Sequence, residues 1–318
     1  MRLFLRIGSL TELGSPAVEV RGLQSEEQST LFAFVEPYWT VQADADPDRA
    51  SRVEVVGRPE VSTSDAEEGY WSLDGRRVLI RRGDTATTTV LRVINVVRAI
   101  FKVALVGLGG VNCHSGVLDS GGHGVLVTGA RGAGKTTVVR VCAASGMTVV
   151  ANDQCVLLPG EPARAIGFPA LVAVRTGSSP AGCPLPDRPL LETTDRQDGR
   201  PRRRYTIQSV AEASGSLCSG HTTAELLVSY AKTAEPGVLA LTPGSTVEWL
   251  TAAGFGLPEA YGPDLIHLAT TALGVPSAEH RFASVRAALR NTVHYRITCA
   301  ADRLAQLPGR FPELMPGR

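Results

Sequence analysis

The chain has 318 residues, of which 43% are hydrophobic and 20% are charged, as in an ordinary globular protein of one large or two medium domains. The formal net charge of +1 gives no reason to expect a nucleic-acid partner. Six scattered cysteines without a C-x-x-C pair argue against a disulfide framework or a zinc site. The longest apolar run, 90–108, is interrupted by charged residues, which argues against a membrane span. We therefore expect a cytoplasmic protein.

The first 86 residues are predicted to form a β-rich N-terminal domain. Short apolar segments alternate with Gly, Pro, Asp and Ser, which is typical of strands joined by turns. Asp74-Gly75 between two apolar segments is a hairpin signal. The expected strands are 2–7, 17–20, 31–35, 52–56, 70–73 and 76–80.

Residues 87–318 are predicted to form a second domain with an α/β fold, so that the whole chain is α+β. A strand, a glycine-rich loop, a helix and a second strand follow one another within about thirty residues, which is the signature of an α/β core. The elements expected up to residue 151 are a helix over 87–105, strands over 111–118 and 124–128, a helix over 134–144 and a strand over 148–151.

Residues 176–204 differ in character from the segments around them. They contain five prolines and a cluster of arginines with little apolar periodicity, which is typical of a long mobile loop or a poorly ordered insert. Beyond this loop we expect strands over 226–231, 238–241 and 292–298, and helices over 262–273, over 278–291 and from residue 301.

Residues 129–136, Gly-Ala-Arg-Gly-Ala-Gly-Lys-Thr, match the G-x4-G-K-[ST] pattern of loops that bind phosphate groups. Lysine occurs only at positions 102, 135 and 232, so composition does not explain a lysine in this loop. Backbone N–H groups and the start of the helix would hold a β-phosphate. Lys135 would bridge the β- and γ-phosphates, and Thr136 would bind Mg²⁺. A glycine-rich turn without a ligand is the alternative. The predicted nucleotide-binding residues are Gly129, Ala130, Arg131, Gly132, Ala133, Gly134, Lys135, Thr136 and Thr137.

Asp153 is the next candidate, because it follows the strand 148–151. If that strand runs parallel to 124–128, Asp153 emerges at the sheet edge where the loop lies. A carboxylate there can act as general base toward a hydroxyl or, with Thr136, in Mg²⁺ binding. The alternative is an aspartate that caps a turn. Asn152 is expected to support or cap this turn.

His114 is predicted to lie beside the loop by the register of the hairpin. If the turn centres on Gly121-Gly122, Asp119 opposes Gly124 and His114 opposes Gly129. The candidate catalytic residues are therefore Asp153, His114 and Lys135. A strand histidine that bonds a backbone carbonyl is the alternative reading of His114.

Arg175 and Arg204 are candidates for clamping the acceptor or the transferring phosphoryl group. Arg204 is singled out within the run 202–204 because it precedes the apolar residues Tyr205 and Ile207, and mobile loops can close over phosphoryl-transfer sites and supply charge. A solvated basic surface is the alternative.

The segments 113–136 and 146–153 together resemble the C-terminal domain of HPr kinase/phosphorylase and its kinase relatives. In that family a histidine-bearing strand precedes a phosphate loop, which leads through one helix to a strand ending in two aspartates. The resemblance covers 111–175, including Gly167-Phe168-Pro169. It implies a fold like the nucleotide domain of phosphoenolpyruvate carboxykinase, with ATP and Mg²⁺ as cofactors and a hydroxyl as acceptor.

The resemblance also implies roles for single residues. Lys135 and Thr136 match the nucleotide and metal positions, His114 matches the strand histidine, and Asn152-Asp153 occupies the aspartate pair. If the first aspartate is the base in those enzymes, Asn152 cannot replace it, so either Asp153 takes that role or the reaction is altered. Thr137 stands where the family has a glutamate.

The sequence favours an ATP- and Mg²⁺-dependent kinase that phosphorylates a hydroxyl on a small metabolite or a peptide, in a biosynthetic or tailoring pathway. The alternatives are a regulatory ATP-binding module acting through a protein partner, and a true HPr-type serine protein kinase/phosphorylase. An N-K-x-D guanine signature is absent, which argues against a GTPase switch. We expect neither nucleic acid nor membrane as partner, and a homo-oligomer stays open.

Overall fold

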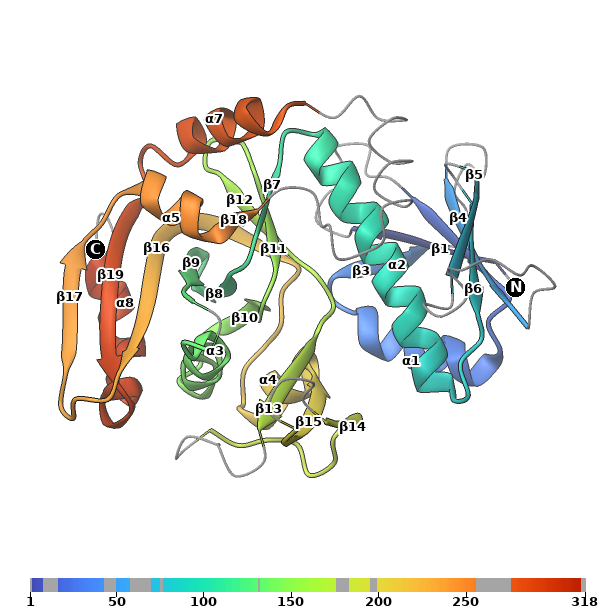
Figure 1. Cartoon of the computed structure of the whole chain (residues 1–318), viewed down its shortest axis with the longest axis horizontal. Helices are drawn as coiled ribbons and strands as arrows, with labels where there is room; N and C mark the ends of the chain where they lie inside the picture. Colours follow the sequence, from blue (N-terminus) through green and yellow to red (C-terminus); the bar gives the residue numbers. More distant parts are fainter. Residues whose placement is uncertain are drawn as a thin grey trace. The chain divides into compact units, whose positions relative to one another are not determined.

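The computed structural model describes residues 2–7, 17–42, 50–57, 70–74, 77–130, 132–175, 183–194, 199–255 and 276–315. The chain forms two compact units, and the fold is of the mixed α/β kind (Figure 1). The first unit comprises 1–108 with 256–276, and the second comprises 109–255 with 277–318. No helix in these described ranges is both long enough and apolar enough to cross a membrane.

The first unit is built on a six-stranded sheet in the order β3-β1-β2-β4-β6-β5. The strands β2, β4 and β6 run parallel to one another, and β5 pairs with β6 in the predicted hairpin, whose turn at 75–76 lies outside the described residues. The strands are β1 (Arg2–Ile7), β2 (Val18–Arg21), β3 (Trp39–Gln42), β4 (Ser51–Val56), β5 (Tyr70–Asp74) and β6 (Arg77–Arg81).

The prediction of a strand over 31–35 is wrong, because these residues end the helix α1 (Ser25–Val35). The backbone N–H of Gln24 donates to the carboxylate of Glu27 at 2.7 Å, which completes a capping box at the start of the helix. Leu31, Phe34 and Val35 are buried. Their spacing of three and four residues is that of a helix face.

The predicted helix over 87–105 is confirmed as α2 (Ala86–Gly107), which begins at the N-cap Thr85. Its side chains pack against α1, β4 and β6, and the ring of Phe101 meets that of Trp39 edge to face at 5.2 Å between centroids. Because α2 packs on this sheet, the division between the units falls after Leu108 and not at residue 87, where we expected it.

The second unit is built on a ten-stranded sheet. Its main path is β10-β8-β9-β16-β12-β11-β7-β18, and β19 joins β16 while β17 joins β19. The strands are β7 (Val111–Cys113), β8 (Gly116–Ser120), β9 (His123–Thr128), β10 (Thr148–Ala151), β11 (Cys155–Leu158), β12 (Arg164–Gly167), β16 (His221–Thr233), β17 (Leu239–Pro243), β18 (Gly254–Phe255) and β19 (Val293–Ala300).

Helices pack on both faces of this sheet. Trp249 of α5 and Val285 of α7 are buried in one core cluster with Val117 and Leu126. The neighbouring position Gly116 faces the other way, since a Cβ there would lie 2.6 Å from Val139 of α3. The helices are α3 (Lys135–Ala144), α4 (Ile207–Ala213), α5 (Thr246–Ala253), α7 (Ala278–Ala288), α8 (Leu307–Leu314) and the 3₁₀ helix η4 (Ala301–Gln306). The expected helix over 262–273 lies outside the described residues.

A small antiparallel sheet, in the order β13-β15-β14, completes the second unit. Its strands are β13 (Leu171–Arg175), β14 (Leu191–Thr194) and β15 (Pro201–Thr206). The prediction of a loop over 176–204 is therefore wrong for β14 and for the arginines of β15, while 176–182 and 195–198 lie outside the described residues. Tyr205 and Val172, which face each other across β15 and β13, are buried and hold this sheet onto the unit.

Candidate functional site

Three segments meet at one edge of the large sheet. The strand β9 ends at Thr128, β10 ends at Ala151, and β8, antiparallel to both, begins at Gly116. The predicted parallel direction of β9 and β10 is confirmed, although β8 lies between them. The glycine-rich loop follows β9, the Asn152-Asp153 pair follows β10, and His114 lies just before β8. All three therefore lie at the same edge of the sheet.

The predicted hairpin register is confirmed, with Asp119 opposite Gly124. The single strand expected over 111–118 is instead two strands, β7 and β8, interrupted at His114 and Ser115. The hydroxyl of Ser115 donates to the carbonyl oxygen of Val127 at 3.1 Å, and that of Thr128 donates to the carbonyl oxygen of His114 at 3.2 Å. These two bonds hold His114 beside the end of β9.

The side chains of His114 and Asp153 are hydrogen-bonded, with 2.9 Å between Nε2 and Oδ1. The histidine ring is 39% exposed and the carboxylate 52% exposed, so solutes can reach both groups. A carboxylate bound to an imidazole is an acid–base pair that can take up or release a proton. The ring of His114 thus bonds a carboxylate, unlike the alternative prediction in which it bonds only a backbone carbonyl.

Lys135 stands at the start of α3 and completes this group. Its Nζ donates to the carbonyl oxygens of Gly129 at 2.8 Å and Ala130 at 3.3 Å, and the residue is only 7% exposed. Burial lowers the pKa of Lys135, and the charge of Asp153 acts in the opposite direction. The structure thus brings together all three predicted catalytic residues.

The backbone of the loop adopts conformations that favour glycine. Gly132 and Gly134 have φ angles of 79° and 106°, in the left-handed region that residues with a Cβ avoid. A Cβ at Gly129 would lie 2.4 Å from the carbonyl oxygen of Tyr230, closer than atoms can approach. Arg131 lies outside the described residues. The loop leads directly into the N-terminus of α3, where a helix favours negative charge.

Tyr230 of β16 lies next to this loop, and sequence reasoning placed it only in a predicted strand. A Cβ at Gly134 would lie 3.6 Å from the Cε1 atom of the Tyr230 ring, and the residue is buried. Burial, followed by the nearby Cys299, raises the pKa of Tyr230 to about 12. The ring is therefore neutral and acts as a packing surface under the loop.

The residues around the loop include oxygen ligands that suit Mg²⁺. Thr136 and Thr137 lie in the first turn of α3 and are half-buried. The hydroxyl of Thr136 and the carboxylate of Asp153 are hard oxygen donors, which Mg²⁺ prefers. No group of three or more His, Cys, Asp or Glu side chains comes together as a metal site in the described part of the chain.

Asn152 is placed differently from Asp153. It is 4% exposed, and its Oδ1 has no hydrogen-bond partner among the described residues. A buried amide oxygen without a partner is costly, and an amide does not serve as a general base. Of the two residues, Asp153 is the one that reaches solvent and His114.

The two predicted clamp residues lie on the small sheet and not on a mobile loop. Arg175 ends β13 and lies directly opposite Arg202. Arg204 of β15 donates from Nε to the hydroxyl of Thr193 at 3.1 Å. Their role toward a phosphoryl group stays a prediction.

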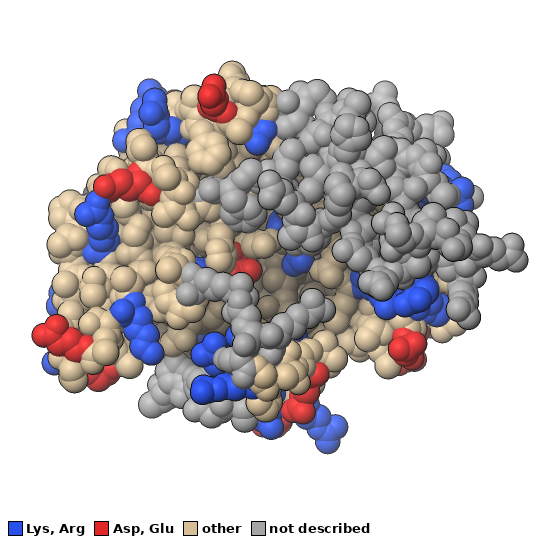
Figure 2. Space-filling view, in the orientation of Figure 1, with Lys and Arg blue, Asp and Glu red and all other residues tan. Residues whose placement is uncertain are grey.

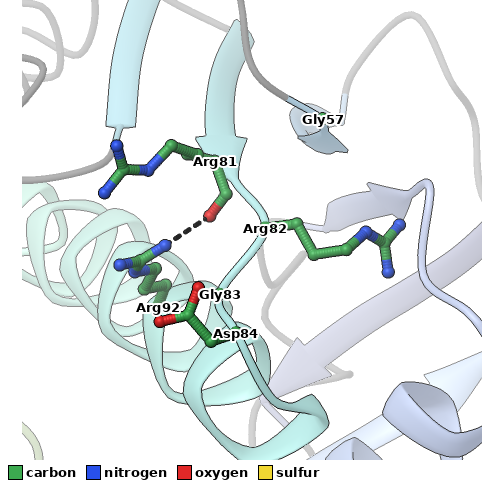
Figure 3. Close-up of a pocket in the computed structure, with 6 residues that line it drawn as sticks. All are labelled: Gly57, Arg81, Arg82, Gly83, Asp84 and Arg92. Atoms are coloured by element: carbon green, nitrogen blue, oxygen red, sulfur yellow. Dashed lines mark hydrogen bonds between the residues drawn. The ribbon is translucent and has the colours of Figure 1, made fainter.

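The first unit has a cavity of about 370 Å³ at the start of α2 (Figure 3). Two of its arginines are bonded within the protein: Arg92 donates to the carbonyl oxygen of Arg81 at 2.8 Å, and Arg82 pairs with Glu27. In Figure 3 the side chains of Arg81 and Arg82 point away from each other. Their guanidinium groups do not come together at one point of the cavity, so we do not take this cavity as the candidate site. Its lining residues are Gly57, Arg81, Arg82, Gly83, Asp84 and Arg92.

Among solved structures, the chain is similar to the HPr(Ser) kinase/phosphatase from Coxiella burnetii. The comparison covers 64% of this chain and 96% of that chain, with 12% sequence identity and a TM-score of 0.31. No protein-family model matches the chain, and no curated protein matches it in sequence. A similarity of this size does not establish an activity.

Proposed function

We propose that the second unit is an HPr kinase-like, ATP- and Mg²⁺-dependent phosphotransferase that transfers the γ-phosphate to a hydroxyl of a small metabolite or a peptide. The observation that carries the proposal is the hydrogen bond between His114 and Asp153 at the sheet edge where the loop 129–136 begins. A phosphate loop alone fits hundreds of activities. A proton acceptor at the same edge favours transfer to an acceptor hydroxyl.

The loop supports the nucleotide half of this proposal. Nothing lies within 4 Å of a Cβ at Gly132, and Gly129 tolerates no side chain next to Tyr230. The ammonium group of Lys135 lies over the carbonyl oxygens at the start of the loop, where it would contact phosphate oxygens. Because Lys135 is mostly buried, its charge is weakly screened by solvent.

The acceptor half rests on Asp153. A carboxylate oxygen of Asp153 would accept the proton of the acceptor hydroxyl as the hydroxyl oxygen attacks the γ-phosphorus. The bond from that phosphorus to the β-phosphate oxygen would break at the same time, and ADP would leave. His114 positions the carboxylate through the bond at Oδ1. Mg²⁺, held by Thr136 and Asp153, would neutralise charge on the phosphates. Asn152 cannot take the role of base, so we assign it to Asp153 alone.

Isothermal titration with Mg·ATP tests the nucleotide half. We expect the wild-type protein to bind, and Lys135→Met to lose affinity by about 100-fold, since a charge-assisted bond in a buried site is lost. Lys232→Met is the matched control, because it removes an exposed lysine from β16 and should change affinity by less than about twofold. Equal binding by wild type and Lys135→Met would refute the assignment of the loop.

A further inference from the structure

Two cysteines lie directly opposite each other in the large sheet. Cys113 of β7 pairs with Cys155 of β11 in an antiparallel register (Figure 1). Two positions along, Val111 lies opposite Leu157. All four residues belong to one buried core cluster, so their side chains point to the same face of the sheet. Both cysteines are free thiols and both are 0% exposed.

The two thiol groups are in contact. Burial, followed by a hydrogen bond with the thiol of Cys155, raises the pKa of Cys113. Directly opposite residues of an antiparallel pair have Cα atoms about 4.5–5.5 Å apart, and a disulfide joins Cα atoms that are about 4.4–6.8 Å apart. The strand pairing therefore holds these two cysteines at a spacing that a disulfide can span.

The cysteine pair lies next to the candidate functional site. His114 directly follows Cys113, and Asp153 comes two positions before Cys155. Beyond these short linkers the same two chain segments pair again, as β8 with β10. The hydrogen bond between His114 and Asp153 joins the two linkers. A bond between the sulfur atoms would thus close a small ring that contains this hydrogen bond.

We propose that Cys113 and Cys155 form a reversible disulfide on exposure to hydrogen peroxide, and that this disulfide holds His114 beside Asp153. One thiol loses its proton and attacks a peroxide oxygen, the O–O bond breaks, and a sulfenic acid and water form. The second thiolate then attacks the sulfenic sulfur, the S–O bond breaks, and the departing hydroxide takes up a proton to become water. The two cysteines lose two electrons, which reduce the peroxide. This modification does not rest on the proposed phosphotransfer.

Hydrogen peroxide must reach two buried thiols. It is small and uncharged and needs no charged surface to guide it, and Figure 2 shows basic and acidic side chains scattered among uncharged ones on the visible face. The strand β7 has three residues, and β18 on its other side has two. The path of the described strands ends at β18, and short strands at the end of a sheet open locally at a low cost in free energy. We therefore expect the disulfide to form slowly, during such openings.

A second pair of cysteines provides the comparison. Cys142 of α3 is also 0% exposed and lies near enough to Cys183 for the two groups to interact. Cys142 belongs to a helix and Cys183 lies outside any strand, so no strand register sets their spacing. Buried cysteines often serve only as small apolar side chains. We assign that role to Cys142.

Peptide mapping by mass spectrometry tests the proposal on the full-length protein after treatment with hydrogen peroxide, with free thiols alkylated before digestion. The wild type should yield a peptide pair joined through Cys113 and Cys155, and dithiothreitol should release it. Cys113→Ala should lose this pair. The matched control Cys142→Ala removes an equally buried thiol from another element, and should form the bridge at a rate within about twofold of wild type.

Hydrogen–deuterium exchange tests whether the bridge holds the site. Peptides that cover 111–116 and 150–158 should exchange at least about threefold more slowly in the oxidised wild type than in the reduced wild type. Oxidant should leave the exchange of Cys113→Ala unchanged. Circular dichroism checks that this variant is folded, and Cys155→Ala takes its place if it is not. The mapping of the wild type is decisive without either variant.

Three results would overturn the proposal. The first is a wild-type protein without the linked peptide pair after oxidation. The second is a mixture in which Cys113 is joined to other cysteines as often as to Cys155. The third is equal exchange of the two segments in the oxidised and reduced wild type. Failure of Mg·ATP binding or of phosphoryl transfer would leave this proposal standing, since neither is measured here.

Discussion

His114 and Asp153, 39 positions apart in the chain, are joined by a hydrogen bond of 2.9 Å between Nε2 and Oδ1. The pair forms because β8 begins, and β10 ends, at the same edge of the sheet. Lys135 faces Asp153 closely enough for the two charges to affect each other. The proposed base, positioning residue and phosphate-binding cation thus come from three different segments.

The coupling between His114 and Asp153 can be measured with a double-mutant cycle. We expect His114→Gln to reduce kcat, because the carboxylate loses the bond that orients it, and to have little further effect when Asp153 is already Asn. The coupling energy should be about 1–3 kcal/mol. Steady-state rates of phosphoryl transfer for wild type, both single variants and the double variant give this energy. Additive effects of the two substitutions would mean that the residues act independently.

Nucleotide affinity should depend on pH through Lys135. Burial lowers its pKa from the ordinary value of 10.5, so the ammonium group loses its proton at a lower pH than an exposed lysine does. As the pH is raised, the Mg·ATP affinity of the wild type should therefore begin to decrease before the pH reaches 10.5. Lys135→Arg should bind Mg·ATP more weakly, because a guanidinium group is wider than an ammonium group. The guanidinium stays charged over this pH range, so the affinity of this variant should not decrease with the titration of residue 135. Parallel pH profiles for the two proteins would contradict the prediction.

Gly129 should be intolerant of any side chain. In Gly129→Ala the new Cβ would lie 2.4 Å from the carbonyl oxygen of Tyr230, so loop and strand must separate. We expect a loss of about 2–3 kcal/mol in the free energy of unfolding, together with weaker Mg·ATP binding. Urea denaturation measures the first and calorimetry the second.

Gly122→Ala is the control for that experiment. Gly122 has a φ of 94° in the hairpin turn, and nothing lies within 4 Å of a Cβ there. It should cost only the conformational strain of about 1–2 kcal/mol and leave nucleotide binding unchanged. Equal losses of binding in the two variants would show that contact with Tyr230 is not what matters at Gly129.

Stability should fall in mild acid through His294. This residue is 5% exposed, its Nε2 lies 3.0 Å from the hydroxyl of Ser229, and burial lowers its pKa from 6.5. The folded state then binds fewer protons than the unfolded state below pH 6.5. The contribution of neutral His294 is therefore complete above that pH and is lost as the pH falls below it.

Urea denaturation at about pH 7.5 and about pH 5.5 measures this effect. The wild type should lose more stability between the two conditions than His294→Gln, whose amide does not titrate. His221, whose pKa is also lowered by burial, is kept in both proteins so that its contribution cancels. An identical loss in the two proteins would assign the acid sensitivity to other groups.

The sequence was informative where structure is local. Glycine placement, apolar periodicity and a two-residue turn predict the loop 129–136, the helix after it and the hairpin before it. These three segments form the edge of the sheet at which His114 and Asp153 meet. The strand pairing of β9 with β16 joins residues about a hundred positions apart, and no local pattern specifies it. Tyr230 could therefore not be placed under the loop.

Two errors have a common cause. Residues 31–35 are apolar at all five positions, which fits either a strand or a buried part of a helix, and the capping interaction between Gln24 and Glu27 favours a helix. The strand β15 was not predicted, because it contains three arginines and only Tyr205 is buried in it. In both cases the apolar pattern of the segment alone does not select the structure.

We propose that Asp153 accepts the proton of an acceptor hydroxyl during transfer from ATP. The most direct test of this role is mass spectrometry of a panel of hydroxyl-bearing metabolites and peptides after incubation with the protein and Mg·ATP. We predict that one acceptor gains a single phosphoryl group with the wild type. Asp153→Asn should lower that rate by about 10²- to 10⁴-fold while it still binds nucleotide. Full transfer activity in Asp153→Asn would show that Asp153 is not the base.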